Sequence, residues 1–199
     1  MPQVPGGSFL FLRKFLKHGT RVASVRESSR ALATEVCRFV TPDKPQVILE
    51  LGAGTGAVTC IAERKLHPDS RLVAVELDAD FAAVLAQRCP RAEVVCGDVA
   101  ELDKRLPELG IERFDLVLSG LPTPSLPKAV NRAVFETIER VAADACFSQL
   151  TLMPWYFWKL YRGLYEQVDF NLVLASLPPG GVYHGRRLRA DWRDHVPGK

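Results

Sequence analysis

The sequence lacks the features that usually place a chain across a membrane, outside the cell or around a metal ion. No run of about 18 uninterrupted apolar residues occurs, so we expect no membrane-spanning segment. The apolar run at 9–12 stops at Arg13 and Lys14 and no small-residue cleavage site follows, so we expect no secretory signal. The five cysteines include no Cys-x-x-Cys pair and the four histidines form no cluster, which predicts reduced thiols and no bound metal.

The chain also lacks internal repeats, long serine, glutamine or glycine tracts, and any linker long enough to separate two domains. Its 199 residues are 47% hydrophobic and 25% charged, which suits one sizeable core and argues against a disordered chain. We therefore predict a single domain over residues 28–192. A basic amphipathic arm at 1–27 is expected to precede it, and a flexible tail at 193–199 to follow it.

The net charge of +3 is concentrated at the two ends of the sequence. Residues 1–30 carry six basic side chains and one acidic, and residues 183–199 carry five basic and two acidic. The middle, residues 31–182, has 15 basic against 20 acidic groups. This distribution favours a localised anionic partner, and an ordinary solvated surface is the alternative.

Short apolar runs alternate with longer amphipathic stretches, the pattern of a parallel sheet covered by helices. The expected strands are 46–51, 71–76, 92–96, 114–119, 146–152, 171–177 and 182–188. The expected helices are 29–39, capped by Ser28 or Ser29, then 57–65, 79–88, 101–109, 127–142 and 155–167. The fold class is therefore α/β, a Rossmann-like domain with seven mostly parallel strands and helices on both faces.

A glycine-rich turn, Glu50-Leu51-Gly52-Ala53-Gly54-Thr55-Gly56, stands between the first expected strand and the next helix. Glycines allow a tight turn and let a ligand approach the amides at the start of a helix. The spacing also satisfies a relaxed dinucleotide pattern, but a carboxylate before the turn would repel a pyrophosphate. It suits the ammonium and sulfonium of S-adenosylmethionine. We therefore predict that this methyl donor binds here, in contact with Glu50, Gly52, Ala53, Gly54 and Gly56.

Two more acidic residues follow the next two expected strands. Glu76 ends the second strand, where such a carboxylate accepts the two ribose hydroxyls of a nucleoside. Asp98 follows the third strand and is placed to accept from the adenine amino group. Each acid alone would fit a solvated turn, but acids after three successive strands favour a cofactor crevice. Their neighbours Leu77 and Val99 are further expected cofactor contacts.

The fourth expected strand ends in Ser119-Gly120-Leu121-Pro122. Ligands of open α/β sheets bind at the carboxyl ends of the strands where the strand order reverses, and strands one and four flank that crevice. Backbone carbonyls turned outward here would hold an amine in line with the sulfonium methyl, so that catalysis is mostly positioning. We predict catalytic contacts from Ser119, Gly120 and Leu121, with Ser119 also touching the cofactor. A turn shaped only by backbone geometry is the alternative.

Several segments together carry a family resemblance: Phe11-Leu12-Arg13-Lys14-Phe15-Leu16, Ser28-Ser29-Arg30-Ala31-Leu32-Ala33, the stretch 49–56, the Ser-Gly-Leu-Pro step at 119–122, and Leu177-Pro178-Pro179 with Val182-Tyr183. Over residues 9–189 the chain resembles the bacterial phospholipid N-methyltransferases and is similar to the rRNA adenine dimethylases. The resemblance implies a class I enzyme that methylates phosphatidylethanolamine stepwise towards phosphatidylcholine. The glycine turn is generic to class I enzymes, whereas the Ser-Gly-Leu-Pro and Leu-Pro-Pro segments are more specific.

A phospholipid substrate needs contacts for a zwitterionic headgroup, and residues near the C-terminus offer them. Arg186 and Arg187 are expected to clamp phosphate oxygens with bidentate hydrogen bonds. Tyr183 and His184 beside them are expected to orient the amine or to remove its proton. The alternatives are a solvated arginine run and a structural histidine.

Two segments are expected at a membrane surface. Residues 9–18, projected as a helix, place aromatic and aliphatic side chains on one arc and basic ones on the other, which suits an anionic membrane. Trp155 and Tyr156 begin an aromatic cluster at 155–161 that is expected to contact the lipid substrate. For both segments, packing onto the protein's own domain is the alternative. We expect a cytoplasmic enzyme held peripherally on the inner face of the cytoplasmic membrane.

Three other functions remain open from the sequence. An RNA adenine N6-methyltransferase would use the basic ends on phosphates, but Thr123 and Pro124 offer no aromatic face for a flipped base. The others are a small-molecule amine methyltransferase and a binding module without catalysis. We expect no obligate nucleic-acid partner, and the sequence leaves protein partners unknown.

Overall fold

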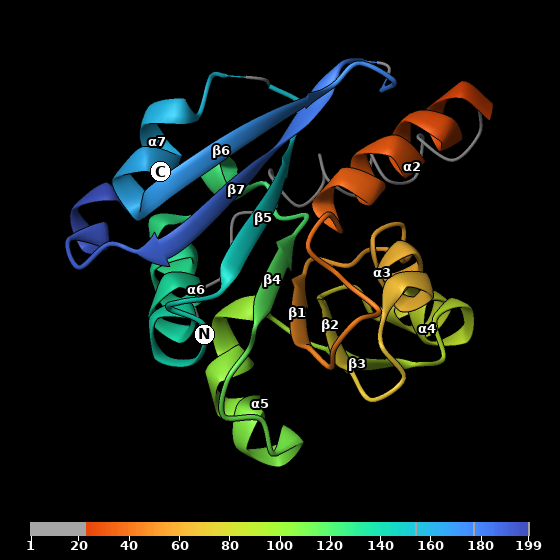
Figure 1. The fold of residues 1–199 in the computed structure, drawn as a ribbon. Coiled ribbons are helices and arrows are strands. Elements are labelled where there is room, and N and C mark those ends of the chain that lie inside the picture. The colour runs from red at the N-terminus through yellow and green to blue at the C-terminus, as the bar shows by residue number, and fades with distance from the viewer. Residues whose placement is uncertain (1–22, 154, 177, 199) are drawn as a thin grey trace.

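A computed structural model describes residues 23–153, 155–176 and 178–198, with the backbone alone at 23–29. Its strands form one seven-stranded sheet in the order β3-β2-β1-β4-β5-β7-β6 (Figure 1). They are β1 (Val47–Leu51), β2 (Arg71–Glu76), β3 (Ala92–Cys96), β4 (Leu116–Ser119), β5 (Cys146–Thr151), β6 (Tyr165–Val173) and β7 (Gly180–Leu188). β1 to β5 pair in parallel, and β7 is antiparallel to both β5 and β6. The predicted seven-stranded, mostly parallel α/β sheet is confirmed.

Helices cover both faces of this sheet. Figure 1 shows α2 (Ala23–Val36), α3 (Thr59–Lys65) and α4 (Ala79–Arg88) on one side. On the other side lie α5 (Leu102–Leu109), α6 (Lys128–Val141) and α7 (Trp158–Leu164). Short 3-10 turns occupy Val99–Glu101, Thr123–Ser125 and Trp192–His195. Each crossover between parallel strands thus carries a helix, as parallel pairing requires.

The two cores follow from the alternation of side chains along each strand. Leu49 and Val117 face the α6 side and pack with Phe135, whereas Ile48 and Leu118 face the α2–α3 side. The same alternation assigns the polar residues at the strand ends to a face. Glu50 shares the α3 face with Ile48, and Ser119 shares the α6 face with Val117.

Two predicted segments differ from the structure. The helix expected at 29–39 corresponds to α2, which runs from Ala23 to Val36, so Ser28 and Ser29 lie inside it and do not cap it. The expected helix 155–167 is shorter and ends at Leu164, and the following strand runs from Tyr165 to Val173 instead of 171–177. The nine residues of β6 pair with the nine-residue β7 in an antiparallel hairpin, and this ladder outweighs the helical pattern of the local sequence.

Residues 193–198, where the sequence predicts a flexible tail, pack against α6 in the structure. Arg193 forms two hydrogen bonds to the Glu139 carboxylate, and the Trp192 indole donates to the same group. Asn131 donates to the Pro197 carbonyl at 2.9 Å. In the described part of the chain, no helix is long and apolar enough to cross a membrane.

Candidate active site

The carboxyl edge of the sheet brings the two predicted motifs side by side. β1 and β4 are neighbours at the centre of the sheet, and Leu51 is opposite Ser119 in the register. The Gly120 amide donates to the Leu51 carbonyl at 2.9 Å. From β1 the chain crosses to the α3 face, and from β4 it crosses to the α6 face, so the strand order reverses between them. A crevice at such a switch point is where open α/β sheets bind ligands.

The glycine loop adopts a backbone that only glycine favours. Gly52, Gly54 and Gly56 have φ values of +71°, +58° and +89°. The amides of Gly52 and Ala53 both donate to the Val75 carbonyl, at 3.0 and 3.1 Å, which ties the loop to β2. A Cβ on Gly120 would lie 2.9 Å from the Gly52 carbonyl oxygen, so the end of β4 approaches the loop as closely as a residue without a side chain allows.

Glu50 lies beneath this loop with an unsatisfied carboxylate oxygen. The side chain is 2% exposed, and its Oε2 has no hydrogen-bond partner among the described residues. Burial raises the pKa of the Glu50 carboxyl to about 8, and the neighbouring Thr59 offsets only part of that rise. A buried carboxylate without a partner is costly, so the site fits a cationic ligand group such as the ammonium of S-adenosylmethionine.

The other predicted cofactor residues line the same edge. The Glu76 carboxylate accepts from the Gly54 amide at 2.7 Å and from the Asp78 amide at 2.9 Å, which links the glycine loop to the end of β2. Asp98 accepts from the Ala100 amide through Oδ1 and caps the turn after β3. Its Oδ2 has no partner among the described residues. Beside them Leu77 is half exposed and Val99 is buried.

A buried polar network that the sequence did not predict holds the Ser-Gly-Leu-Pro step at 119–122. Gln149 on β5 is 1% exposed and donates to the Leu121 carbonyl at 2.8 Å. It accepts from the Thr123 hydroxyl at 3.0 Å, and Asn131 on α6 donates to the Thr123 carbonyl at 2.7 Å. The sequence of β5 does not single out Gln149, because Ser148 and Thr151 on the same strand are polar as well.

This network corrects the expected role of the Leu121 carbonyl. That oxygen was predicted to face an amine, but it is engaged by Gln149. The Gly120 carbonyl accepts no hydrogen bond from the described residues, and the Gly120 backbone itself abuts the glycine loop. Of the predicted catalytic set, Gly120 is therefore best placed to accept from a substrate. Ser119 is buried, and its hydroxyl accepts from the Leu121 amide at 3.4 Å.

Tyr183 and His184 do not act together, because adjacent strand residues face opposite sides of the sheet. Tyr183 is opposite Gln149 in the register and level with Ser119, but it is fully buried. Its ring stacks on Tyr161 with centroids 4.6 Å apart. Burial raises the pKa of its hydroxyl. Tyr183 therefore packs behind the end of β4, and its burial keeps it from contacting a substrate.

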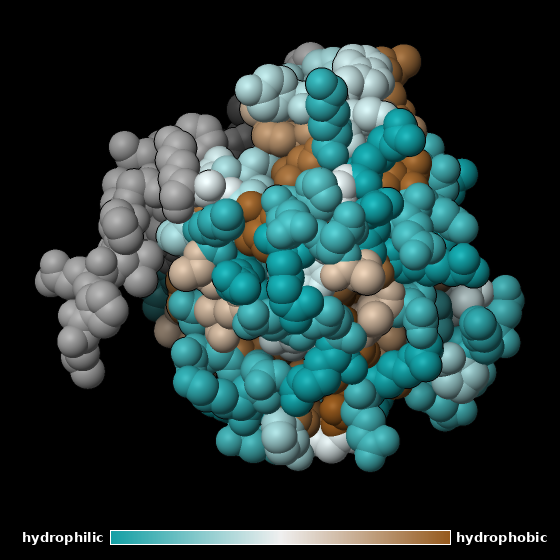
Figure 2. All heavy atoms as spheres, turned by 90° about the vertical axis from the view of Figure 1, so that its left-hand side faces the viewer, coloured by the Kyte–Doolittle hydropathy of each residue, from teal (hydrophilic) through white to brown (hydrophobic). Residues whose placement is uncertain are grey.

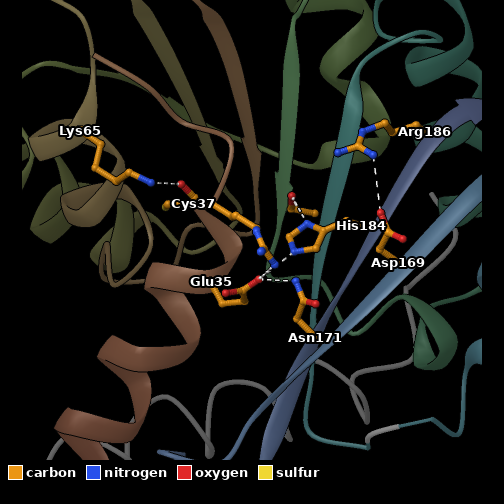
Figure 3. Close-up of polar contacts among 9 residues, drawn as sticks. Glu35, Cys37, Lys65, Asp169, Asn171, His184 and Arg186 are labelled. Carbon is orange, nitrogen blue, oxygen red and sulfur yellow. Dashed lines mark hydrogen bonds and ion pairs between the residues drawn. The ribbon is translucent and has the colours of Figure 1, made fainter. Parts of the chain in front are cut away.

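His184 is on the α2 face in a closed relay, which corrects its prediction as a catalytic base. Its Nδ1 is 2.9 Å from the Ser148 hydroxyl, and its Nε2 is 3.2 Å from Glu35 Oε1 (Figure 3). Asn171 donates to the same Glu35 oxygen. Burial lowers the pKa of His184, although Glu35 opposes this. Ser148 and His184 are almost fully buried, so this relay fastens α2 to the sheet and does not meet substrate.

Arg186 and Arg187 lie at the opposite edge from the cofactor loop, so the predicted phosphate clamp is not beside it. β7 runs antiparallel, and Arg186 pairs with Gln167 near the start of β6. Its guanidinium lies 4.8 Å from the Phe39 ring centroid. It also pairs with Asp169, at 3.5 Å from Oδ2 (Figure 3). Arg187 is exposed at the same end of β7.

Trp155 and Tyr156 are exposed in the segment that follows β5 at the carboxyl edge. They are 62% and 73% exposed, with Met153 at 50% and Leu174, in the β6–β7 turn, at 75%. We call these four residues the apolar rim. Most of the face seen in Figure 2 is hydrophilic, with apolar atoms at its upper end and smaller apolar areas near its middle and lower end. The predicted membrane helix at 9–18 lies outside the described residues.

One prediction concerns the network around the 119–122 step. Replacing Gln149 by Leu removes the donor to the Leu121 carbonyl, and an unsatisfied buried acceptor costs about 1–3 kcal/mol. We expect kcat to fall by about one to two orders of magnitude while the dissociation constant of S-adenosylmethionine stays within about twofold. The measurement is kcat together with calorimetric cofactor binding.

The matched control is Ser148→Ala, which changes the adjacent buried polar residue on the opposite face of β5. It should lower thermal stability through the His184 relay and leave kcat unchanged. Equal loss of kcat in both variants would mean that Gln149 acts only through stability.

Comparisons with known proteins agree with this geometry. A family model described as a methyltransferase domain matches residues 48–145. The ornithine lipid N-methyltransferase of Singulisphaera acidiphila is 42% identical over 185 residues, covering 91% of this chain and 96% of that protein. The ribosomal RNA small subunit methyltransferase A of Geobacter metallireducens is 49% identical over 147 residues, covering 69% of this chain but 52% of that protein. The chain thus spans about half the length of this second relative.

A solved structure shows the same fold with the methyl donor in place. Aeropyrum pernix fibrillarin in complex with natively bound S-adenosyl-L-methionine aligns at a TM-score of 0.57 and 16% identity, covering 80% of this chain and 76% of that one. The methyltransferase domain, this fold and the glycine loop confirm S-adenosylmethionine as the cofactor. The chain belongs to the S-adenosylmethionine-dependent class I methyltransferases, and its nearly full-length relative is a lipid N-methyltransferase.

Proposed function

We propose that this enzyme transfers the methyl group of S-adenosylmethionine to the amine nitrogen of a membrane aminolipid. The observation that carries the proposal is the 42% identity, over almost the whole of both chains, to an ornithine lipid N-methyltransferase. The site supports it through Gly120, which abuts the glycine loop and whose carbonyl accepts no hydrogen bond from the described residues. A neutral carbonyl acceptor holds an amine by its N–H group and leaves the lone pair for the methyl carbon.

The headgroup we propose first is that of ornithine lipid, with phosphatidylethanolamine second. Both offer a primary amine, but phosphatidylethanolamine also carries a phosphate. The arginines expected to bind that phosphate, Arg186 and Arg187, lie at the far edge of the sheet. The similarity to an ornithine lipid enzyme therefore outweighs the phospholipid resemblance of the sequence.

Competition between the two lipids tests this order. Vesicles that contain equal amounts of ornithine lipid and phosphatidylethanolamine are incubated with enzyme and methyl-labelled S-adenosylmethionine, and the labelled lipids are separated by mass. We expect label mainly on ornithine lipid. Label mainly on phosphatidylethanolamine would restore the phospholipid assignment.

We further propose that the enzyme works peripherally on the inner face of the cytoplasmic membrane, with the apolar rim towards the lipid. The rim lies at the same edge as the cofactor crevice, so contact with the bilayer brings a headgroup to the site. Aromatic side chains suit the interface between headgroups and acyl chains. The segment 9–18 is a second proposed contact, for anionic lipid.

A double substitution of Trp155 and Tyr156 by Ser tests the rim. Because both side chains are largely exposed, the fold should be unaffected, but the apolar area available to lipid falls. We expect at least about tenfold weaker sedimentation with vesicles, and an unchanged dissociation constant for S-adenosylmethionine. Val84→Ser, an exposed apolar residue on α4, is the control. If the control lost as much vesicle binding as the double variant, the apolar rim would not be the membrane contact.

A second candidate is methylation of adenine in ribosomal RNA. It is favoured by the 49% identity to a ribosomal RNA methyltransferase, although the match spans about half of that protein. Transfer of label to RNA in a parallel reaction would support this candidate.

A further inference from the structure

Two cysteines that are 29 positions apart in the sequence meet beneath the cofactor loop. Cys60 lies on α3 and Cys89 directly follows α4, and their Sγ atoms are 2.6 Å apart. A disulfide holds its sulfur atoms about 2.0 Å apart, so a small shift separates these thiols from a covalent bond. All five cysteines are described, and this is the one contact between two thiols. The sequence predicted scattered thiols, and the fold pairs two of them.

The pair packs against the third glycine of the cofactor loop. A Cβ on Gly56 would lie 3.2 Å from Cys89 Sγ and 3.6 Å from Cys60 Sγ. The residue before Cys89 also contacts the loop, because the Arg88 guanidinium donates to the Thr55 carbonyl at 2.6 Å. The end of α4 therefore touches the loop at two successive residues, and any movement of Cys89 reaches the backbone that holds the cofactor.

The two thiols differ in access. Cys60 is half-buried and Cys89 is buried. Burial, together with the neighbouring Cys60 sulfur, raises the pKa of the Cys89 thiol. Because Cys60 is the more accessible of the two, a reagent reaches it first, and Cys89 completes the bond.

We propose that Cys60 and Cys89 form a redox-switched dithiol that controls the cofactor loop, with low-molecular-weight disulfides as the oxidant. The Cys60 thiolate attacks one sulfur of the reagent, forms a mixed disulfide and expels one thiolate. The Cys89 sulfur then attacks Cys60, loses its proton and expels the second thiolate. The protein thiols lose two electrons and two protons, and the reagent disulfide becomes two thiols.

Bond formation moves the end of α4 towards α3. Because Arg88 is hydrogen-bonded to the Thr55 carbonyl, this movement also shifts the glycine loop. The loop amides then leave the positions that fit the cofactor. We expect the oxidised protein to bind S-adenosylmethionine at least about fivefold more weakly than the reduced protein. This effect concerns the cofactor and is independent of which substrate is methylated.

The test treats the full chain with oxidised glutathione, maps non-reduced peptides by mass spectrometry and measures cofactor binding by calorimetry. We expect a disulfide-linked Cys60–Cys89 peptide pair and weaker cofactor binding. Dithiothreitol should separate the two peptides and restore the cofactor affinity. Cys60→Ser and Cys89→Ser should each abolish the response, and Cys146→Ser should keep it. Glutathione found only on the exposed Cys96, or the disulfide without a change in cofactor affinity, would overturn the proposal.

Discussion

Replacing Gly120 by Ala is expected to weaken S-adenosylmethionine binding by about 5- to 100-fold and to lower kcat further. The added methyl group would lie 2.9 Å from the Gly52 carbonyl oxygen, which is backbone and has no side chain to rotate away. Either β4 or the glycine loop must move, and overpacking of this kind costs about 1–3 kcal/mol. Both motifs of the site meet at this contact, so one methyl group disturbs the cofactor and the substrate acceptor together. Calorimetry and steady-state kinetics measure the two losses.

Gly97→Ala is the matched control for this variant. Gly97 follows β3 at the same edge of the sheet, and a Cβ there would meet nothing within 4 Å. Its cofactor affinity should therefore equal that of the wild type. If Gly120→Ala also bound the cofactor like the wild type, the contact between β4 and the glycine loop would not define the site.

Replacing Glu50 by Gln is expected to stabilise the cofactor-free protein at alkaline pH and to weaken S-adenosylmethionine binding by about 10- to 100-fold. The loss of affinity follows from removal of a charged acceptor, worth about 1.5–3 kcal/mol. The gain in stability follows because burial raises the pKa of the folded-state carboxyl from 4.5 to about 8. The two effects have opposite signs, which an unspecific loss of structure cannot produce.

The pH dependence of this variant has a defined sign. Between pH 4.5 and about 8 the folded wild type holds a proton on Glu50 that the unfolded chain has lost, so its stability falls as the pH rises through this window. Gln does not titrate, so the variant should lose less stability between pH 6 and pH 8.5. Thermal unfolding without cofactor measures this. If the stability of the wild type and of the variant changed with pH in parallel, the pKa of Glu50 would not be raised.

The same residue predicts proton release on cofactor binding. A bound ammonium favours the ionised carboxylate, so wild-type affinity should rise with pH up to about pH 8. Calorimetry at neutral pH should then show a binding enthalpy that depends on the ionisation enthalpy of the buffer.

The parallel half of the sheet was predictable because its signals are local. The apolar runs at 47–51 and 71–76, the glycine turn and the acids Glu76 and Asp98 each stand where a strand ends. Parallel strands all point the same way, so residues at their carboxyl ends come together at one edge. The same logic found the Ser-Gly-Leu-Pro step, which the β1–β4 register places against the loop.

The antiparallel end of the sheet was not predictable in this way. Tyr183 and Arg186 are three residues apart, which suggests one site, yet β7 runs from the carboxyl edge to the opposite edge. Alternation also separates Tyr183 from His184, which faces Glu35 on a helix 149 positions away in the sequence. Glu35, Gln149 and the Cys60–Cys89 pair act through contacts between distant segments, and no local pattern marks them.

The destination of the methyl group tests the central claim most directly. The full chain is incubated with methyl-labelled S-adenosylmethionine, vesicles that contain ornithine lipid and phosphatidylethanolamine, and ribosomal RNA, and the lipid and RNA fractions are then separated. We predict label on the amine nitrogen of the lipid, strongly reduced with Gly120→Ala and unaffected by Gly97→Ala. Label in the RNA fraction alone, or none in lipid from a protein that binds the cofactor, would contradict a lipid N-methyltransferase.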